Sequence, residues 1–210
     1  MKLFVAITVV IAFCSGCANN EPLHEAATTF PEPTHKHLSQ LPFQTLSKGT
    51  AKLEEITTQT PAFAFEEGTS YFKAYSLPPP AERKIVYLTT FIVGAMWMPS
   101  AFVFYPNFTF LDESFSAILR VDPKLTYKNN FWNTERSGWS TEVEIPNRAR
   151  YLIVHSPASK RGGRLYYKDN SYTPTGTVVP LTQGALYIPG NWWDIYLPAA
   201  MAGRFQIELQ

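Results

Sequence analysis

From about residue 50 onward, proline, glycine and asparagine divide the chain into short segments, and this division is what most constrains its fold. The runs between these turn residues are rich in β-branched and aromatic side chains, which is typical of strands. No stretch of ten or more residues has a convincing helical period. Strands that recur about every 8–12 residues predict a sandwich or a barrel.

The last segment has the clearest strand pattern. In residues 204–209 the apolar side chains Phe205, Ile207 and Leu209 alternate with polar ones. This period of two predicts a half-buried antiparallel strand with one wet face. A parallel α/β fold would need helices between its strands, and the sequence offers none there. We therefore predict an all-β fold, an antiparallel, jelly-roll-like β-sandwich that forms one domain over residues 49–210.

The N-terminal residues have the pattern of a secretory signal peptide. Lys2 precedes an apolar run over residues 3–13, which is too short to span a bilayer but is typical of a secretory signal peptide. The run ends in Cys14-Ser15-Gly16-Cys17, which resembles a bacterial lipobox. We therefore expect residues 1–16 to be a signal peptide and Cys17 to carry lipid. Ordinary signal cleavage without lipid is the alternative.

The residue after the expected lipidated cysteine indicates in which membrane a lipoprotein is anchored. Lipoproteins retained at the inner membrane usually have Asp there, whereas this chain has Ala18. The resemblance to lipoproteins implies the periplasmic face of the outer membrane, with a membrane contact through the lipid anchor. More than one acyl chain makes such anchoring stable.

Residues 17–48 are expected to form a lipidated, flexible tether. Their prolines interrupt both helices and strand ladders, and we find no apolar period in them. His35 and His37 lie in this segment without a surrounding set of carboxylates or thiols. We therefore expect no metal site.

Composition excludes several classes of protein. The chain has 210 residues, of which 17% are charged and 15% aromatic. Disordered proteins have few aromatic residues and a high net charge, so this composition excludes a disordered chain. Removing Lys2 with the leader leaves 17 basic and 17 acidic side chains, which gives no basic footprint for nucleic acid. Of the two cysteines only Cys17 remains after cleavage, so no intramolecular disulfide is expected. No cofactor motif is present.

Four segments between about residue 60 and the C-terminus carry a resemblance to a known family. They are residues 63–70 (FAFEEGTS) with the Leu77-Pro78 stop, residues 104–106 (FYP) with Leu111-Asp112 and Phe115, residues 150–156 (RYLIVHS), and residues 184–190 with 203–209. In this order they resemble the maltose operon periplasmic protein (MalM) family. The resemblance implies an envelope protein associated with carbohydrate uptake and without established enzyme activity.

Residues suited to catalysis do not form a matched set. His155 is expected on a strand, on its inward or half-buried side, as a structural histidine whose hydrogen bonds are satisfied. Glu142 and Glu144 share a strand face, and we interpret them as solvated charges. Asp112-Glu113 are candidates for glycoside hydrolysis by residue type alone. The sequence therefore predicts no enzyme.

Five tryptophans provide the best lead to function. At least four are expected in loops or at strand ends, where binding residues gather on sandwiches. Aromatic rings cover the C–H faces of sugars, and neighbouring Asn or Asp side chains bind their hydroxyls; a protein-contact patch uses similar rings. The candidate contacts are Trp97, Trp132, Trp139, Trp192, Trp193, Asn191 and Asp194.

Two functions follow from these observations. The first is a non-enzymatic, lipid-anchored envelope protein accessory to carbohydrate transport or binding, whose partner is a saccharide or an envelope transport protein. The alternative is an envelope scaffold or interaction lipoprotein that binds a protein partner and no sugar.

Overall fold

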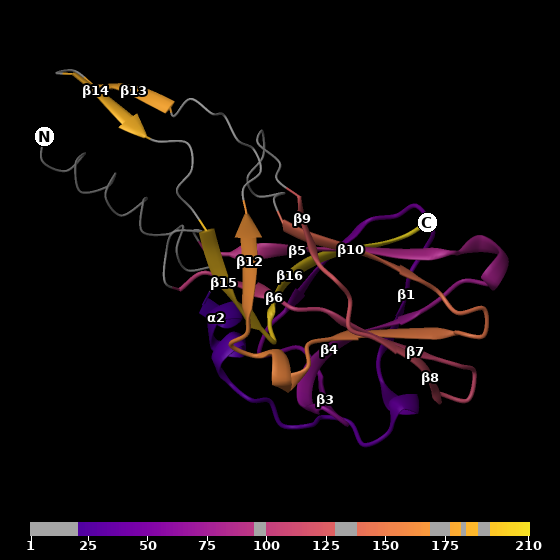
Figure 1. Ribbon diagram of the computed structural model, residues 1–210. Helices are drawn as coiled ribbons and strands as arrows, with labels where there is room; N and C mark the ends of the chain where they lie inside the picture. Colours follow the sequence, from indigo (N-terminus) through magenta and orange to yellow (C-terminus); the bar gives the residue numbers. More distant parts are fainter. Residues whose placement is uncertain (1–20, 95–99, 129–137, 169–176, 182–183, 189–193) are drawn as a thin grey trace, which may run out of the picture.

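The computed structural model describes residues 21–94, 100–128, 138–168, 177–181, 184–188 and 194–210 (Figure 1). Two β-sheets contain most of this part of the chain, and they pack as a sandwich. The prediction of an all-β sandwich is confirmed.

The first sheet contains six strands. Its order is β1 (Phe43–Thr45), β4 (Gly68–Ser76), β11 (Tyr151–His155), β7 (Asn107–Leu111) and β8 (Ala117–Val121), and β3 (Ala62–Phe65) pairs with β4. The strands β3 and β4 form a hairpin, with Glu66 and Glu67 in the turn between them.

The second sheet contains eight strands. Its order is β12 (Arg164–Lys168), β15 (Asp194–Ala200), β6 (Phe102–Phe104), β5 (Ile85–Val93), β10 (Gly138–Glu144) and β9 (Thr126–Lys128), while β16 (Gly203–Leu209) pairs with both β5 and β2 (Lys52–Ile56). Figure 1 shows β5, β10 and β16 in one layer and β4, β7 and β8 in the other. A separate ribbon pairs β13 (Thr177–Leu181) with β14 (Gly184–Ile188).

Both large sheets are mixed, which corrects the expectation of a purely antiparallel sandwich. Strand β1 runs parallel to β4, and β15 runs parallel to β6. In each pair the two strands are far apart in the chain, so no hairpin turn fixes their relative direction. The alternation of apolar and polar residues, from which we predicted antiparallel strands, does not fix the direction of such pairs.

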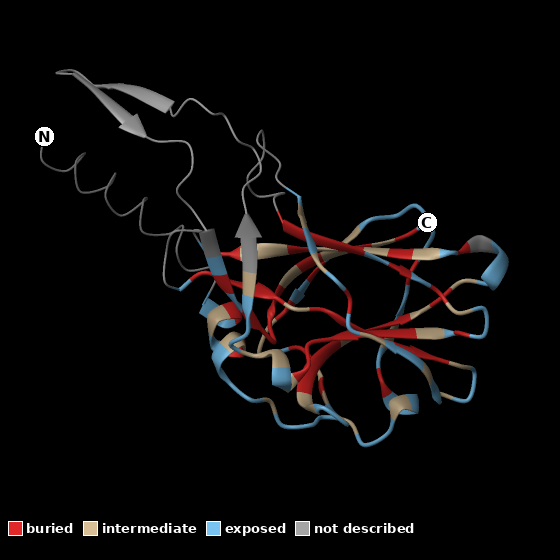
Figure 2. Ribbon diagram, in the orientation of Figure 1, coloured by how far each residue is buried: buried red, intermediate tan, exposed pale blue. Residues whose placement is uncertain are grey.

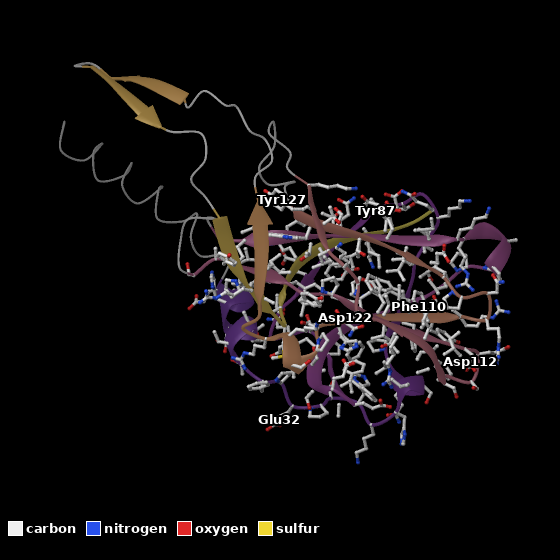
Figure 3. The ribbon with its side chains drawn as sticks, viewed as in Figure 1. Glu32, Tyr87, Phe110, Asp112, Asp122 and Tyr127 are labelled. Carbon is white, nitrogen blue, oxygen red and sulfur yellow. The ribbon has the colours of Figure 1, made fainter. Side chains whose placement is uncertain are left out.

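The main core lies between the two sheets, where Figure 2 shows a concentration of buried residues. Phe110 of the first sheet is fully buried there, and Figure 3 shows it between the layers. Strand β16 contributes Phe205, Ile207 and Leu209, which are fully buried and alternate with half-buried polar residues. The predicted period of two at the C-terminus is therefore confirmed.

A second, smaller core covers the outer face of the first sheet. It contains Phe72 and Ala74 of β4, Ile153 of β11 and Leu111 of β7. Leu41, from the N-terminal segment, buries this outer face together with aromatic residues of β3. Both faces of the first sheet are therefore packed.

The expectation of a flexible tether is wrong for residues 21–48. This segment forms helix α2 (Glu21–Thr28), the short 3-10 helix η2 (Leu38–Gln40) and strand β1. In α2, Leu23 and Ala26 are buried, and Leu23 packs in a small cluster with Val93 and Phe102. The apolar residues between the prolines pack onto the sandwich, so most of the segment belongs to the domain.

Candidate functional site

Most of the tryptophan site predicted from the sequence lies outside the described residues. Those positions are Trp97, Trp132, Asn191, Trp192 and Trp193, and the proposed lipid site Cys17 also lies there. Asp194 begins β15, where it pairs in register with Lys168.

Trp139 is not a loop residue. It belongs to β10, it is only 2% exposed, and it packs edge-to-face on Tyr127 in a cluster with Val103 and Leu197. Its register opposite Thr90 of β5 places the ring inside the fold. Trp139 is therefore a core residue, and the prediction that it contacts a ligand is wrong.

The structure describes both pairs of candidate carboxylates. Glu142 and Glu144 are exposed on β10, as expected. Asp112 lies at the end of the β7–β8 hairpin (Figure 3), where its Oδ1 accepts hydrogen bonds from the backbone N–H groups of Ser114 and Ser116. Hydrogen bonds from Ser114 and Ser116 hold the pKa of Asp112 below its usual value. Asp112 stabilises the turn.

His155 occupies a less ordinary position. On β11 the side chains of Leu152 and Val154 enter the main core, so that of His155 faces the outer side of the first sheet. It is nevertheless only 2% exposed, because the ring of Phe65 stacks on it with centroids 3.9 Å apart and planes 10° apart. The expected burial of His155 is confirmed, but its ring lies under β3 and outside the space between the sheets.

The hydrogen bonding of the His155 ring is incomplete. Its Nε2 lies 3.5 Å from the Oγ1 of Thr109, at the limit of a hydrogen bond, and its buried Nδ1 has no hydrogen-bond partner among the described residues. Burial, assisted by the positive charge of Arg120, lowers the pKa of His155 to about 3. The imidazole is therefore neutral at physiological pH, and its Nδ1 is buried without a hydrogen bond from the described residues. The expectation of a fully satisfied structural histidine is wrong on this point.

The His155 cavity, a space of about 180 Å³, opens beside this ring. Its floor is the outer face of the first sheet, where Thr109 of β7 lies in register between Ile153 of β11 and Arg120 of β8. Strand β3 and η2 supply the walls. The lining residues are Leu38, Phe63, Ala64, Phe65, Glu66, Glu67, Thr109, Ala117, Arg120 and His155.

An ion pair stands at the mouth of the cavity. The guanidinium of Arg120 donates two hydrogen bonds to the carboxylate of Glu66, one from Nη2 to Oε1 at 2.9 Å and the other from Nη1 to Oε2. Both side chains are exposed, and the hydrogen bond from Arg120 holds the pKa of Glu66 below its usual value. An exposed pair of this kind adds little to stability, so its charges remain available to a polar ligand.

This arrangement suits binding better than catalysis. A general base works best when its pKa lies near the operating pH, and the pKa of His155 lies far below it. Of the two carboxylates that line the cavity, Glu66 is paired with Arg120. Across the residues described by the structure, no group of three or more His, Cys, Asp or Glu side chains could hold a metal ion.

The comparisons with known proteins add no relative. No protein-family model matches the chain, and neither a curated protein nor a solved structure matches it. Within the described residues, none of the helices is long and apolar enough to cross a membrane.

Proposed function

We propose that this protein is a non-enzymatic, lipid-anchored cell-envelope protein of the maltose operon protein type, accessory to carbohydrate transport or binding. The observation that carries the proposal is the His155 cavity, in which aromatic and aliphatic walls lie beside a polar floor and a charged mouth. Sugars combine apolar C–H faces with hydroxyl edges, and a ligand site is built from apolar walls with a few placed polar groups.

The proposed location in the cell envelope rests on the signal-peptide pattern of residues 1–16 and on Cys17. A lipid at Cys17 would hold the sandwich at the periplasmic face of the outer membrane, where saccharides pass on their way into the cell. With 17 basic and 17 acidic side chains, the mature chain would have only weak electrostatic attraction to the membrane. The lipid would therefore provide the attachment.

Calorimetric titration tests the proposal. The mature chain carrying Cys17→Ser is titrated with hexoses and with linear glucose oligosaccharides, and its melting temperature is measured with and without each sugar. We expect saturable heat and a rise in melting temperature, because a ligand that binds the native state stabilises it. Unchanged heat and melting temperature across the whole panel would rule out a saccharide function.

A protein-binding function is favoured by a different surface. Phe43, Phe115 and Tyr151 form a half-buried aromatic cluster on the outer face of the first sheet, with ring centroids 4.5–5.7 Å apart. Aromatic residues are enriched at protein interfaces. If no saccharide binds, capture of one defined envelope protein that is lost in Tyr151→Ser would support the scaffold function.

A further inference from the structure

We propose that the His155 cavity binds one pyranose ring, inserted end-on with a hydroxyl directed at His155. This inference rests on the proposed function and names the ligand class and the binding mode. It requires three properties of the cavity: room for a single ring, a floor that accepts a neutral hydroxyl, and a mouth that binds further hydroxyls.

Size limits the ligand to one ring. An engineered protein cavity of about 150 Å³ holds a benzene molecule, whereas pockets for drug-sized ligands occupy about 300–1,000 Å³. The His155 cavity, at about 180 Å³, lies close to the first of these values. One six-membered ring fills it, and the remaining units of an oligosaccharide stay outside.

The floor selects a neutral hydroxyl. The Nδ1 of His155 has no hydrogen-bond partner in the part of the chain that the structure describes, and it belongs to a side chain that is 98% buried. Burial of a polar atom without a partner is unfavourable. Because the imidazole is neutral, it has one donor and one acceptor nitrogen. Nδ1 is closed to solvent in this structure, so a hydroxyl reaches it once the side chains over it move aside. A carboxylate at this depth would lose its hydration, and the neutral imidazole offers it no opposite charge in return.

The walls and the mouth distinguish a pyranose from a plain phenol. Leu38, Phe63 and Phe65 offer apolar surface to the C–H faces of a ring. Glu66, Glu67 and Arg120 surround the opening with charged donors and acceptors. A phenol has a single hydroxyl and would leave these groups unused, whereas a pyranose carries hydroxyls around its ring that bond to them.

Filling the cavity provides the first test. Ala117 lines the cavity and is exposed, so Ala117→Leu should occupy part of the ligand space without disturbing the main core. Ala51→Leu is the matched control, because Ala51 is exposed just before β2 and does not line the cavity. We expect the dissociation constant to rise at least tenfold in Ala117→Leu and to stay unchanged in Ala51→Leu.

Removing the charge at the mouth provides the second test. Arg120→Gln should weaken binding about tenfold, since one charge-assisted hydrogen-bonding group is lost. Arg204→Gln is its control, because Arg204 makes a comparable ion pair with Glu55 in the other sheet. Circular dichroism and the melting temperature of each variant establish that it is folded.

The ligands are glucose, galactose, mannose, N-acetylglucosamine, linear glucose oligosaccharides of two to six units, and phenol. End-on binding predicts that a single hexose binds, and that dissociation constants within the glucose series differ by less than about threefold. If the wild-type protein binds no sugar, the proposed function fails together with this inference. If it binds sugar equally well in both cavity variants, the function stands and the cavity assignment is overturned. If the protein binds phenol and none of the sugars, the assignment of a pyranose as the ligand is overturned.

Discussion

The imidazole of His155 links the stability of the fold to pH. In the unfolded chain a histidine has a pKa near 6.5, whereas burial lowers the pKa of His155 in the native state to about 3. Between these two values the unfolded state binds a proton that the native state does not. The contribution of His155 is therefore complete above pH 6.5 and is lost as the pH falls toward 3.

We expect the free energy of unfolding to be about 2 kcal/mol lower at pH 5 than at pH 7 through His155. Urea denaturation at pH 7, 6 and 5 measures it. This window lies above the range in which Glu54 and Asp122, whose pKa values are lowered by ion pairs that outweigh burial, take up protons. His155→Gln should flatten the pH dependence, and exposed His37→Gln should leave it in place. Equal pH slopes in the wild type and His155→Gln would contradict the assignment.

Helix α2 depends on tertiary packing for its stability. Eight residues are too few for a stable isolated helix, so α2 depends on burying Leu23 and Ala26 against the sandwich. Leu23 lies in a cluster with Val93, Phe102 and Ala200, which come from strands of the second sheet. The helix therefore joins the N-terminal segment to the sandwich.

Leu23→Ala should lower the free energy of unfolding by about 2–4 kcal/mol, since it leaves a cavity in this cluster. Leu53→Ala is the control, because Leu53 is 64% exposed on β2 and its truncation should cost less than about 0.5 kcal/mol. Urea denaturation of both variants makes the comparison. A Leu23→Ala protein as stable as Leu53→Ala would mean that α2 does not dock in solution.

Strand β10 depends on close contact at its first residue. A Cβ atom at Gly138 would lie 2.1 Å from the carbonyl oxygen of Thr90, so β10 and β5 cannot pair there around a side chain. We expect Gly138→Ala to cost about 3 kcal/mol. Gly162→Ala, at φ +73° with no atom within 4 Å of the added carbon, should cost about 1 kcal/mol. Thermal denaturation distinguishes them, and equal losses would contradict this role of Gly138.

The elements were predictable to different degrees. Strand β16 was evident, because its polar and apolar residues alternate without interruption. Helix α2 was missed because prolines dominate the segment, although Pro22 lies in the first turn, where proline is tolerated. The spacing of Leu23, Ala26 and Ala27 was a helical signal, but it covered too few residues to outweigh the prolines.

At the scale of the whole molecule, the site could not be predicted from spacing. Phe65 and His155 are far in the chain from each other and from the β7–β8 hairpin that carries Thr109 and Arg120. They meet because β3 pairs with β4, β4 with β11, and β11 with β7. A shift of one residue in the pairing of β7 with β8 or with β11 would turn Arg120 or His155 to the opposite face. Strand register is set by packing between the sheets, and no local pattern in the sequence records it.

The proposed lipid anchor concerns the whole molecule. If a lipid at Cys17 holds the protein at the membrane, Cys17→Ala should move it to the soluble periplasmic fraction, because the balance of basic and acidic side chains makes bulk electrostatic attraction to the membrane weak. Fractionation followed by immunoblotting measures the shift. Ser15→Ala, which keeps a small residue before the cysteine, should stay at the membrane. Membrane retention of Cys17→Ala would show that attachment does not depend on a lipid at this residue.

The outer strands of the first sheet bear on how copies of this protein behave when they are crowded together. Its order ends on β1, which is three residues long, and on β8, whose register with β7 shifts between Phe110 and Leu111 and which carries Arg120. Short, irregular or charged edges are poor templates for another strand. Arg120, which lines the cavity, therefore also opposes edge-to-edge aggregation, and substituting it is expected to lower solubility.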